Sequence, residues 1–129
     1  MKCIHCGKGV NRRNKYCSLK CQKEHQYKKY IISWKNGEVN GMRGEYQISS
    51  YIRRYIFQKY NNKCAICGWG EINPYTHNIP LEIEHKDGNY KNKIEENLIL
   101  LCPNCHSLTS TYKGANLNKG RSSRKKYNQ

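Results

Sequence analysis

Eight cysteines in four close pairs constrain this chain more than any other feature. The pairs are Cys3/Cys6, Cys17/Cys21, Cys64/Cys67 and Cys102/Cys105. Two pairs together supply four thiolates, the ligand set of a closed structural zinc site. Such a site fixes two distant chain segments and contributes roughly 10–16 kcal/mol of folding free energy in zinc-finger peptides. We therefore expect two structural Zn²⁺ sites, the first from the first two pairs and the second from the last two.

The composition indicates why metal is needed. Leu, Ile, Val and Phe make up only 22 of the 129 residues, and 24 Lys+Arg against 9 Asp+Glu give a net charge of +15. This composition is typical of a disordered chain, unless zinc replaces the missing core. A disulfide scaffold is the rival interpretation. Residues 1–17 lack the apolar stretch of a secretory signal, so we expect reduced thiols and a cytoplasmic location. No stretch of the sequence approaches the ~18 apolar residues of a membrane span, so we expect none.

The positive charge favours a polyanion as partner, because Lys and Arg neutralise phosphates and release their counterions. Solubility alone is the alternative, although it rarely needs so much charge of one sign. The candidate phosphate-binding residues lie in three parts of the chain: Arg12, Arg13 and Lys15; Arg53 and Arg54; and Arg121, Arg124, Lys125 and Lys126.

Four segments are expected. Residues 1–35 form an N-terminal treble-clef-like zinc finger that ends in a helix, with Ser18 as a possible N-cap. Residues 36–47 contain three glycines and no apolar periodicity, which is typical of a linker. Residues 48–112 form the second zinc-containing domain. Residues 113–129 are rich in Lys and Arg without a carboxylate side chain, which predicts a disordered basic tail.

The second domain is predicted to be a small α+β unit. A helix capped by Ser49 or Ser50 carries apolar residues at i, i+3, i+4 and i+8: Ile52, Tyr55, Ile56 and Tyr60. The segment IPLEIEH predicts a strand, NLILLC a second strand, and a short helix begins at Pro103. The predicted zinc site joins the knuckle Cys64/Cys67 to the start of this helix.

Four further polar residues have no part in the zinc sites. Histidine ordinarily changes its charge near neutral pH, so His85 suits a general base that activates water. Glu84 is a hard oxygen ligand suited to Mg²⁺ or Mn²⁺, and His106 can complete that metal site. As neighbours on a strand, Glu84 and His85 are expected to point to opposite sides. Asn97 is expected to hydrogen-bond backbone and hold the loop that carries His85.

The segment LEIEHKDGN…ENLILLCPNCHSLTSTY, residues 81–112, resembles the HNH endonucleases. His85, Asn97 and His106 match that family's three landmark residues in order, and the four cysteines from Cys64 to Cys105 match its frequent zinc site. With the N-terminal finger, the chain is similar to small phage-encoded HNH proteins.

The resemblance implies a ββα-metal fold and either nicking or double-strand cleavage of double-stranded DNA with a divalent cation, Mg²⁺ or Mn²⁺, leaving 5′-phosphate and 3′-hydroxyl ends. It implies that His85 is the base, that Glu84 and His106 hold the cation and that Asn97 is structural. Glu84 departs from the family's usual Asp or His, so direct or water-mediated contact with the metal stays open. The alternatives are a DNA-binding protein without activity and an accessory nuclease of a phage packaging machine that needs a partner. A homodimer would suit a double-strand cutter.

Overall fold

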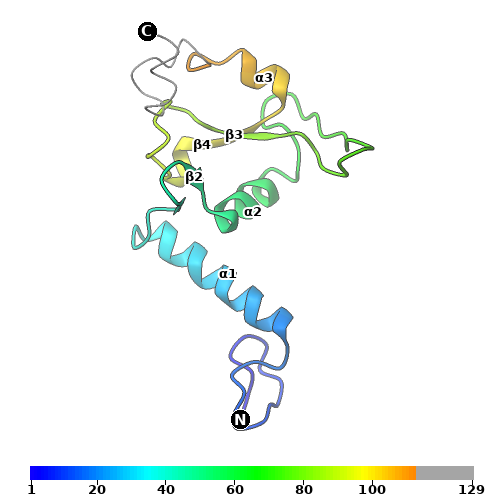
Figure 1. Cartoon of the computed structure of the whole chain (residues 1–129), viewed down its shortest axis with the longest axis vertical. Coiled ribbons are helices and arrows are strands. Elements are labelled where there is room, and N and C mark those ends of the chain that lie inside the picture. Colours follow the sequence, from blue (N-terminus) through cyan, green and yellow to red (C-terminus); the bar gives the residue numbers. More distant parts are fainter. Residues whose placement is uncertain (113–129) are drawn as a thin grey trace. The chain divides into compact units, whose positions relative to one another are not determined.

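The computed structural model describes residues 1–112, in which two compact units are found (Figure 1). The first unit spans Met1–Val39 and the second begins at Asn40, so the boundary falls inside the predicted linker. Each unit contains one cysteine tetrad. Within residues 1–112, every helix is too short or too polar to span a lipid bilayer. The predicted tail, with Arg121, Arg124, Lys125 and Lys126, lies outside the described residues.

In the first unit, a tight turn and a helix bring the first four cysteines together. The backbone NH of Gly7 donates to the carbonyl of Cys3 at 3.0 Å, and Gly7 has a φ of 79°, which favours glycine. Helix α1 (Leu19–Lys35) begins after Ser18, whose hydroxyl accepts from the NH of Cys21 at 3.2 Å. The predicted helix and its N-cap are therefore confirmed.

The second unit starts with two short strands where the sequence predicted only a linker. Strand β1 (Met42–Arg43) pairs with β2 (Gln47–Ile48) in antiparallel register, with Met42 opposite Ile48. The left-handed φ of 68° at Gly44 allows the chain to reverse between them. Strands of two residues carry too little alternation for a sequence pattern to reveal them.

Helix α2 (Ser50–Lys59) supplies the apolar face that its periodicity predicted. Ser49 is the N-cap, and its hydroxyl accepts from the NH of Tyr51 at 3.2 Å. Ile52 and Ile56 are completely buried, and α2 packs against strand β4 (Leu98–Leu101). Lys59 near the helix end forms an ion pair with Glu95 at 3.1 Å.

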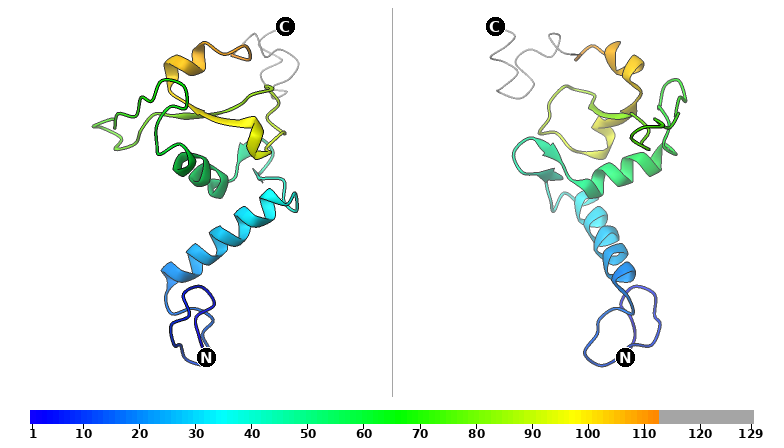
Figure 2. Two further views of the ribbon diagram at one scale, coloured as in Figure 1. Left: turned by 180° about the vertical axis from the view of Figure 1, so that it is seen from behind. Right: turned by 45° about the vertical axis from the view of Figure 1, so that its right-hand side comes forward.

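A hairpin and a short helix form the centre of the second unit. Strand β3 (Glu82–His85) pairs antiparallel with β4, and a short 3₁₀ turn, η1 (Glu95–Asn97), leads into β4. Helix α3 (Pro103–Ser107) follows directly, with Pro103 in its first turn as predicted. Figures 1 and 2 show α2 and α3 on opposite sides of the hairpin, and both helices contact it.

The core of the second unit is small and aliphatic. Its fully buried members come from α2, from the segment before β3 and from β4: Ile52, Ile56, Leu81, Leu98, Leu100 and Leu101. A backbone hydrogen bond connects the knuckle that contains Cys64 and Cys67 to this core: the NH of Ala65 donates to the carbonyl of Leu100 at 2.8 Å. The predicted order of strand, strand and short helix is confirmed, within a small α+β unit that carries a potential metal-binding tetrad.

Candidate active site

The antiparallel register of the hairpin brings His85 and Asn97 to the same end of the sheet. His85 is the last residue of β3 and lies opposite Leu98, the first residue of β4. Asn97 precedes Leu98 directly, so the loop that joins the two strands starts at one candidate residue and ends at the other. Residues twelve positions apart in the sequence therefore become neighbours in space.

The Asn97 side chain makes three hydrogen bonds that close this loop. Its Oδ1 accepts from the backbone NH of Asp87 at 3.1 Å, and its Nδ2 donates to Asp87 Oδ1 at 3.0 Å and to the carbonyl of Asn92 at 2.8 Å. The Asn97 carbonyl also accepts from the NH of Lys86 at 2.8 Å. Asn97 is 7% exposed, so these bonds are largely shielded from water. They fix the backbone that follows His85.

Asp87 is the anionic member of this loop. Burial would raise the pKa of its carboxyl group, but hydrogen bonds from the Asn92 side chain, the Asn89 backbone and the Asn97 side chain outweigh burial and lower it. The carboxylate of Asp87 is therefore charged at neutral pH, and it holds both ends of the loop.

Glu84 and His106 meet across the hairpin. His106 Nδ1 lies 3.8 Å from Glu84 Oε1, and Thr111 Oγ1 donates to the same oxygen at 3.1 Å. Within residues 1–112, His106 Nδ1 is buried and has no hydrogen-bond partner. A buried imidazole nitrogen beside a carboxylate needs either a proton or a cation to satisfy its lone pair. This pair of donors therefore fits a divalent cation, since both atoms can be ligands at 2.0–2.2 Å.

A cavity of about 400 Å³ joins the two halves of the site. Glu84, His85 and His106 all line it. Glu84 and His85 are neighbours on β3 and both border this space, as do Glu82 and Ile83 of the same strand. The other lining residues include cationic and aromatic side chains: Arg43, Tyr46, Arg53, Tyr90 and Lys93. The cavity thus combines a possible base, a possible cation site and positive charge.

Lys93 is a residue of this cavity that the sequence did not reveal. It is only 4% exposed, and its Nζ donates to His85 Nε2 at 3.2 Å and to the carbonyl of Tyr90. A lysine in the polar run KDGNYKNK resembles any solvated loop residue, so no sequence signal distinguishes it from its neighbour Lys91.

The second cysteine tetrad holds α3 against the knuckle. Ligand atoms of Cys64, Cys67, Cys102 and Cys105 lie within 4.8 Å of one another, and none of these cysteines forms a disulfide. Burial raises the pKa of Cys64, but backbone hydrogen bonds from Cys67, Cys102 and Ile66 outweigh it, and the pKa falls to about 6. Burial and the neighbouring sulfurs raise the pKa of Cys105 to about 12. Four thiolates can therefore coexist here only around a cation.

The first tetrad has the same arrangement. Ligand atoms of Cys3, Cys6, Cys17 and Cys21 also lie within 4.8 Å of one another. Cys3 has a pKa of about 6, since backbone hydrogen bonds outweigh burial, and the thiol of Cys17 raises the pKa of Cys21 to about 12. Both groups could hold a metal ion, and their donor set is the one that Zn²⁺ prefers.

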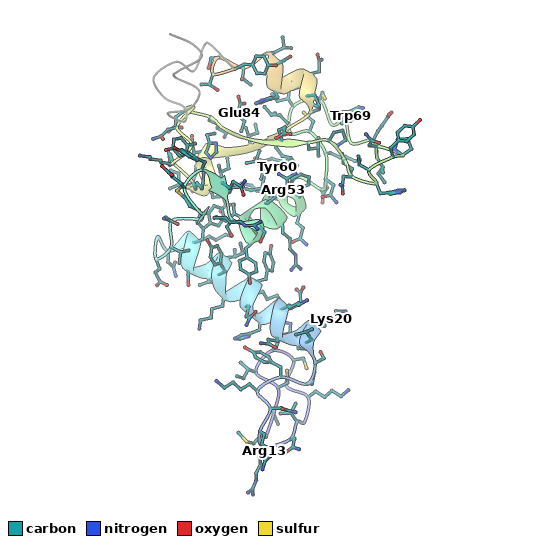
Figure 3. All side chains as sticks on the ribbon, viewed as in Figure 1. Arg13, Lys20, Arg53, Tyr60, Trp69 and Glu84 are labelled. Atoms are coloured by element: carbon teal, nitrogen blue, oxygen red, sulfur yellow. The ribbon has the colours of Figure 1, made fainter. Side chains whose placement is uncertain are left out.

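The predicted phosphate-binding residues are divided between the two units. Arg12, Arg13 and Lys15 are exposed in the first unit, and Figure 3 shows the Arg13 side chain extending away from its loop. Arg53 and Arg54 are exposed on α2 in the second unit. Only Arg53 of these five lines the cavity that contains Glu84, which is also labelled in Figure 3.

One named protein is related to this chain. The chain is 51% identical over 61 residues to the H-N-H endonuclease F-TflIV of Escherichia phage T5. The matched segment covers 45% of this chain and 25% of that protein, so the chain spans about a quarter of its relative's length. No protein-family model and no solved structure matches the chain. The match confirms the predicted resemblance to HNH endonucleases of phage type.

Proposed function

We propose that the protein is a metal-dependent DNA endonuclease of the HNH type. The observation that carries the proposal is the buried Nδ1 of His106, which has no hydrogen-bond partner among residues 1–112 and lies beside the carboxylate of Glu84 in the cavity that His85 also lines. One carboxylate oxygen and one imidazole nitrogen are few ligands, so we expect a largely hydrated and weakly held Mg²⁺ or Mn²⁺. Two Zn²⁺ ions in the cysteine tetrads have structural roles in this proposal.

In the proposed reaction, His85 acts as the general base. Its neutral imidazole takes a proton from a water molecule, and the water oxygen forms a bond to phosphorus. The bond between phosphorus and the 3′ oxygen breaks, and that oxygen takes a proton from solvent, leaving 5′-phosphate and 3′-hydroxyl ends. A cation held by Glu84 and His106 would stabilise negative charge on the phosphate and on the departing oxygen. Asn97 keeps the loop after His85 in place through its three hydrogen bonds.

Binding to DNA is proposed to depend mainly on phosphate contacts. The net charge of +15, Arg53 in the wall of the cavity and the exposed Arg54 on the same helix support this part of the proposal. Contacts of this kind hold the duplex without reading its bases. The N-terminal unit, with Arg12, Arg13 and Lys15, is proposed as a second, non-specific anchor.

Plasmid nicking tests the proposal. Supercoiled plasmid is incubated with the zinc-loaded protein and Mg²⁺ or Mn²⁺, with a chelator in a parallel reaction. We expect open-circular or linear DNA only with the cation, and no product from His85→Ala. His77→Asn is the matched control, because His77 is exposed in another loop and has a φ of 61° that Asn tolerates.

The other outcomes of the plasmid assay distinguish between the alternative functions. Equal cutting by His85→Ala and the wild type would refute the assignment of the base. Binding of DNA without cutting would favour the binding-protein alternative, and cutting only with an added packaging partner would favour an accessory nuclease. Linear product formed before open circles accumulate would favour a homodimer.

A further inference from the structure

We propose that Lys93 is a second catalytic cation, whose ammonium group blocks His85 in the free protein and transfers to a non-bridging oxygen of the scissile phosphate. The inference rests on the proposed endonuclease function. It names the group that would recognise the phosphate next to the base.

The side chain of Lys93 is buried in the wall of the cavity. Lys93 is 4% exposed, although lysine is among the residues that are rarely buried because removing an ammonium from water is costly. Its neighbour Lys91 in the same loop remains exposed, with its Nζ 5.8 Å from the Tyr90 ring centroid. The fold therefore directs one of two nearby lysines inward, to the wall of the cavity that contains Glu84, His85 and His106.

The hydrogen bond between Lys93 and His85 has a fixed direction. An ammonium group can only donate, so the Nε2 that lies 3.2 Å away must accept with its lone pair. That assigns the ring proton to Nδ1 and the free lone pair to Nε2. The lone pair that would take a proton from water is thus already occupied by Lys93 in the DNA-free protein.

A phosphate oxygen and the imidazole of His85 would compete as acceptors for the ammonium group of Lys93. A hydrogen bond from an ammonium to an anionic phosphate oxygen adds the Coulomb attraction of two opposite charges, which a bond to a neutral acceptor lacks. The imidazole Nε2 is a neutral acceptor. A phosphate that enters the cavity should therefore draw the ammonium away from His85, and Nε2 becomes free for water only when substrate is present. The contact with the Tyr90 carbonyl keeps the lysine anchored to the loop meanwhile.

Kinetics of plasmid cleavage test the role of Lys93. Removing one preorganised donor to a reacting anion lowers kcat by roughly 100–1000-fold in enzymes. We therefore expect Lys93→Met, which keeps the shape of the stem, to lower the rate at saturating DNA by about 100-fold or more, with a change in Kd of less than about threefold. Lys93→Arg should recover part of this loss. Lys91→Met is the matched control, because it removes the same charge from the same loop but should leave the saturating rate within about twofold.

Nitrogen NMR of the imidazole ring tests the exchange of contacts without any cleavage. In the wild type with chelator present, a short DNA duplex should shift the signal of His85 Nε2 as Lys93 leaves it. In Lys93→Met that signal should already be shifted before DNA is added. An unchanged Nε2 signal when wild type binds DNA would overturn the proposal even if the protein had no nuclease activity.

The two proposals fail separately. If the wild type cuts and His85→Ala does not, but Lys93→Met cuts as fast as Lys91→Met, the endonuclease stands and the role of Lys93 is refuted. If the wild type does not cut at all, the proposed function fails and the NMR experiment alone decides on Lys93. Circular dichroism and zinc content of each variant show that the comparison is made between folded proteins.

Discussion

Replacing Asn97 by Ala should both destabilise the second unit and abolish the proposed nuclease activity. The substitution removes two hydrogen bonds that involve backbone groups, each worth about 1 kcal/mol, and one to the charged Asp87, worth about 1.5–3 kcal/mol. Because Asp87 is exposed, solvent screening reduces the last value. We expect a loss of about 3 kcal/mol in the free energy of unfolding, which corresponds to roughly 12–24 °C in melting temperature for a domain of this size.

Urea unfolding of zinc-loaded protein, followed by circular dichroism, measures this loss. Asn89→Ala is the matched control, because the exposed side chain of Asn89 lies in the same loop and accepts from the NH of Lys91 at 3.1 Å. That control should lose less than about 1 kcal/mol. Asn97→Asp is almost isosteric, yet it sets a carboxylate oxygen against Asp87 and should be at least as damaging as Ala at pH 7. A stability of Asn97→Ala within about 0.5 kcal/mol of the wild type would refute the view that Asn97 closes the loop.

Three further predictions concern the metal sites and DNA. Cys64→Ser should unfold the second unit outright, because that unit has a small core and a zinc-bound tetrad contributes roughly 10 kcal/mol or more to the free energy of folding. A retained circular dichroism spectrum with a cooperative melt would contradict this prediction. Zinc binding to the second tetrad should release at least two protons at pH 7.5, because Cys67 and Cys105 have raised pKa values and must lose their protons to bind. The affinity for zinc should therefore rise with pH. Calorimetry in buffers of different ionisation enthalpy counts the released protons. Arg53→Gln should weaken DNA binding and reduce the slope of log K against log salt by about 1, and an unchanged slope would exclude a phosphate contact there.

The cysteine pairs made much of the fold predictable. Four thiols at two knuckles fix which segments meet, and the segments IPLEIEH and NLILLC and the position of Pro103 predicted the order of strand, strand and short helix around the second tetrad. The apolar periodicity of α2 was equally informative, since Ile52 and Ile56 are completely buried. Caps at Ser18 and Ser49 could be predicted because their hydroxyl groups satisfy backbone NH groups that every helix start leaves free.

Two features could not be predicted, for different physical reasons. Strands β1 and β2 are too short to produce an alternating pattern, and their pairing depends on a reversal at Gly44. The inward turn of Lys93 depends on contacts with His85 and Tyr90, which only the folded loop brings together. Residue types alone do not distinguish a buried lysine from an exposed lysine when both lie in a polar loop.

The expectation that Glu84 and His85 point to opposite sides of the strand stays a prediction. Alternation along a strand predicts that neighbouring side chains point to opposite sides. His85 is at the strand end, where the loop held by Asn97 begins, and both residues border the same cavity. The cavity also borders Glu82 and Ile83, so a shared border does not give the direction of either side chain.

Pulsed electron paramagnetic resonance of Mn²⁺ bound to the zinc-loaded protein tests most directly whether Glu84 and His106 hold a divalent cation. The account predicts nitrogen modulation from one imidazole ligand in the wild type, its loss in His106→Ala and its retention in His85→Ala. Absence of nitrogen modulation in the wild type, or modulation that survives in His106→Ala, would contradict the account.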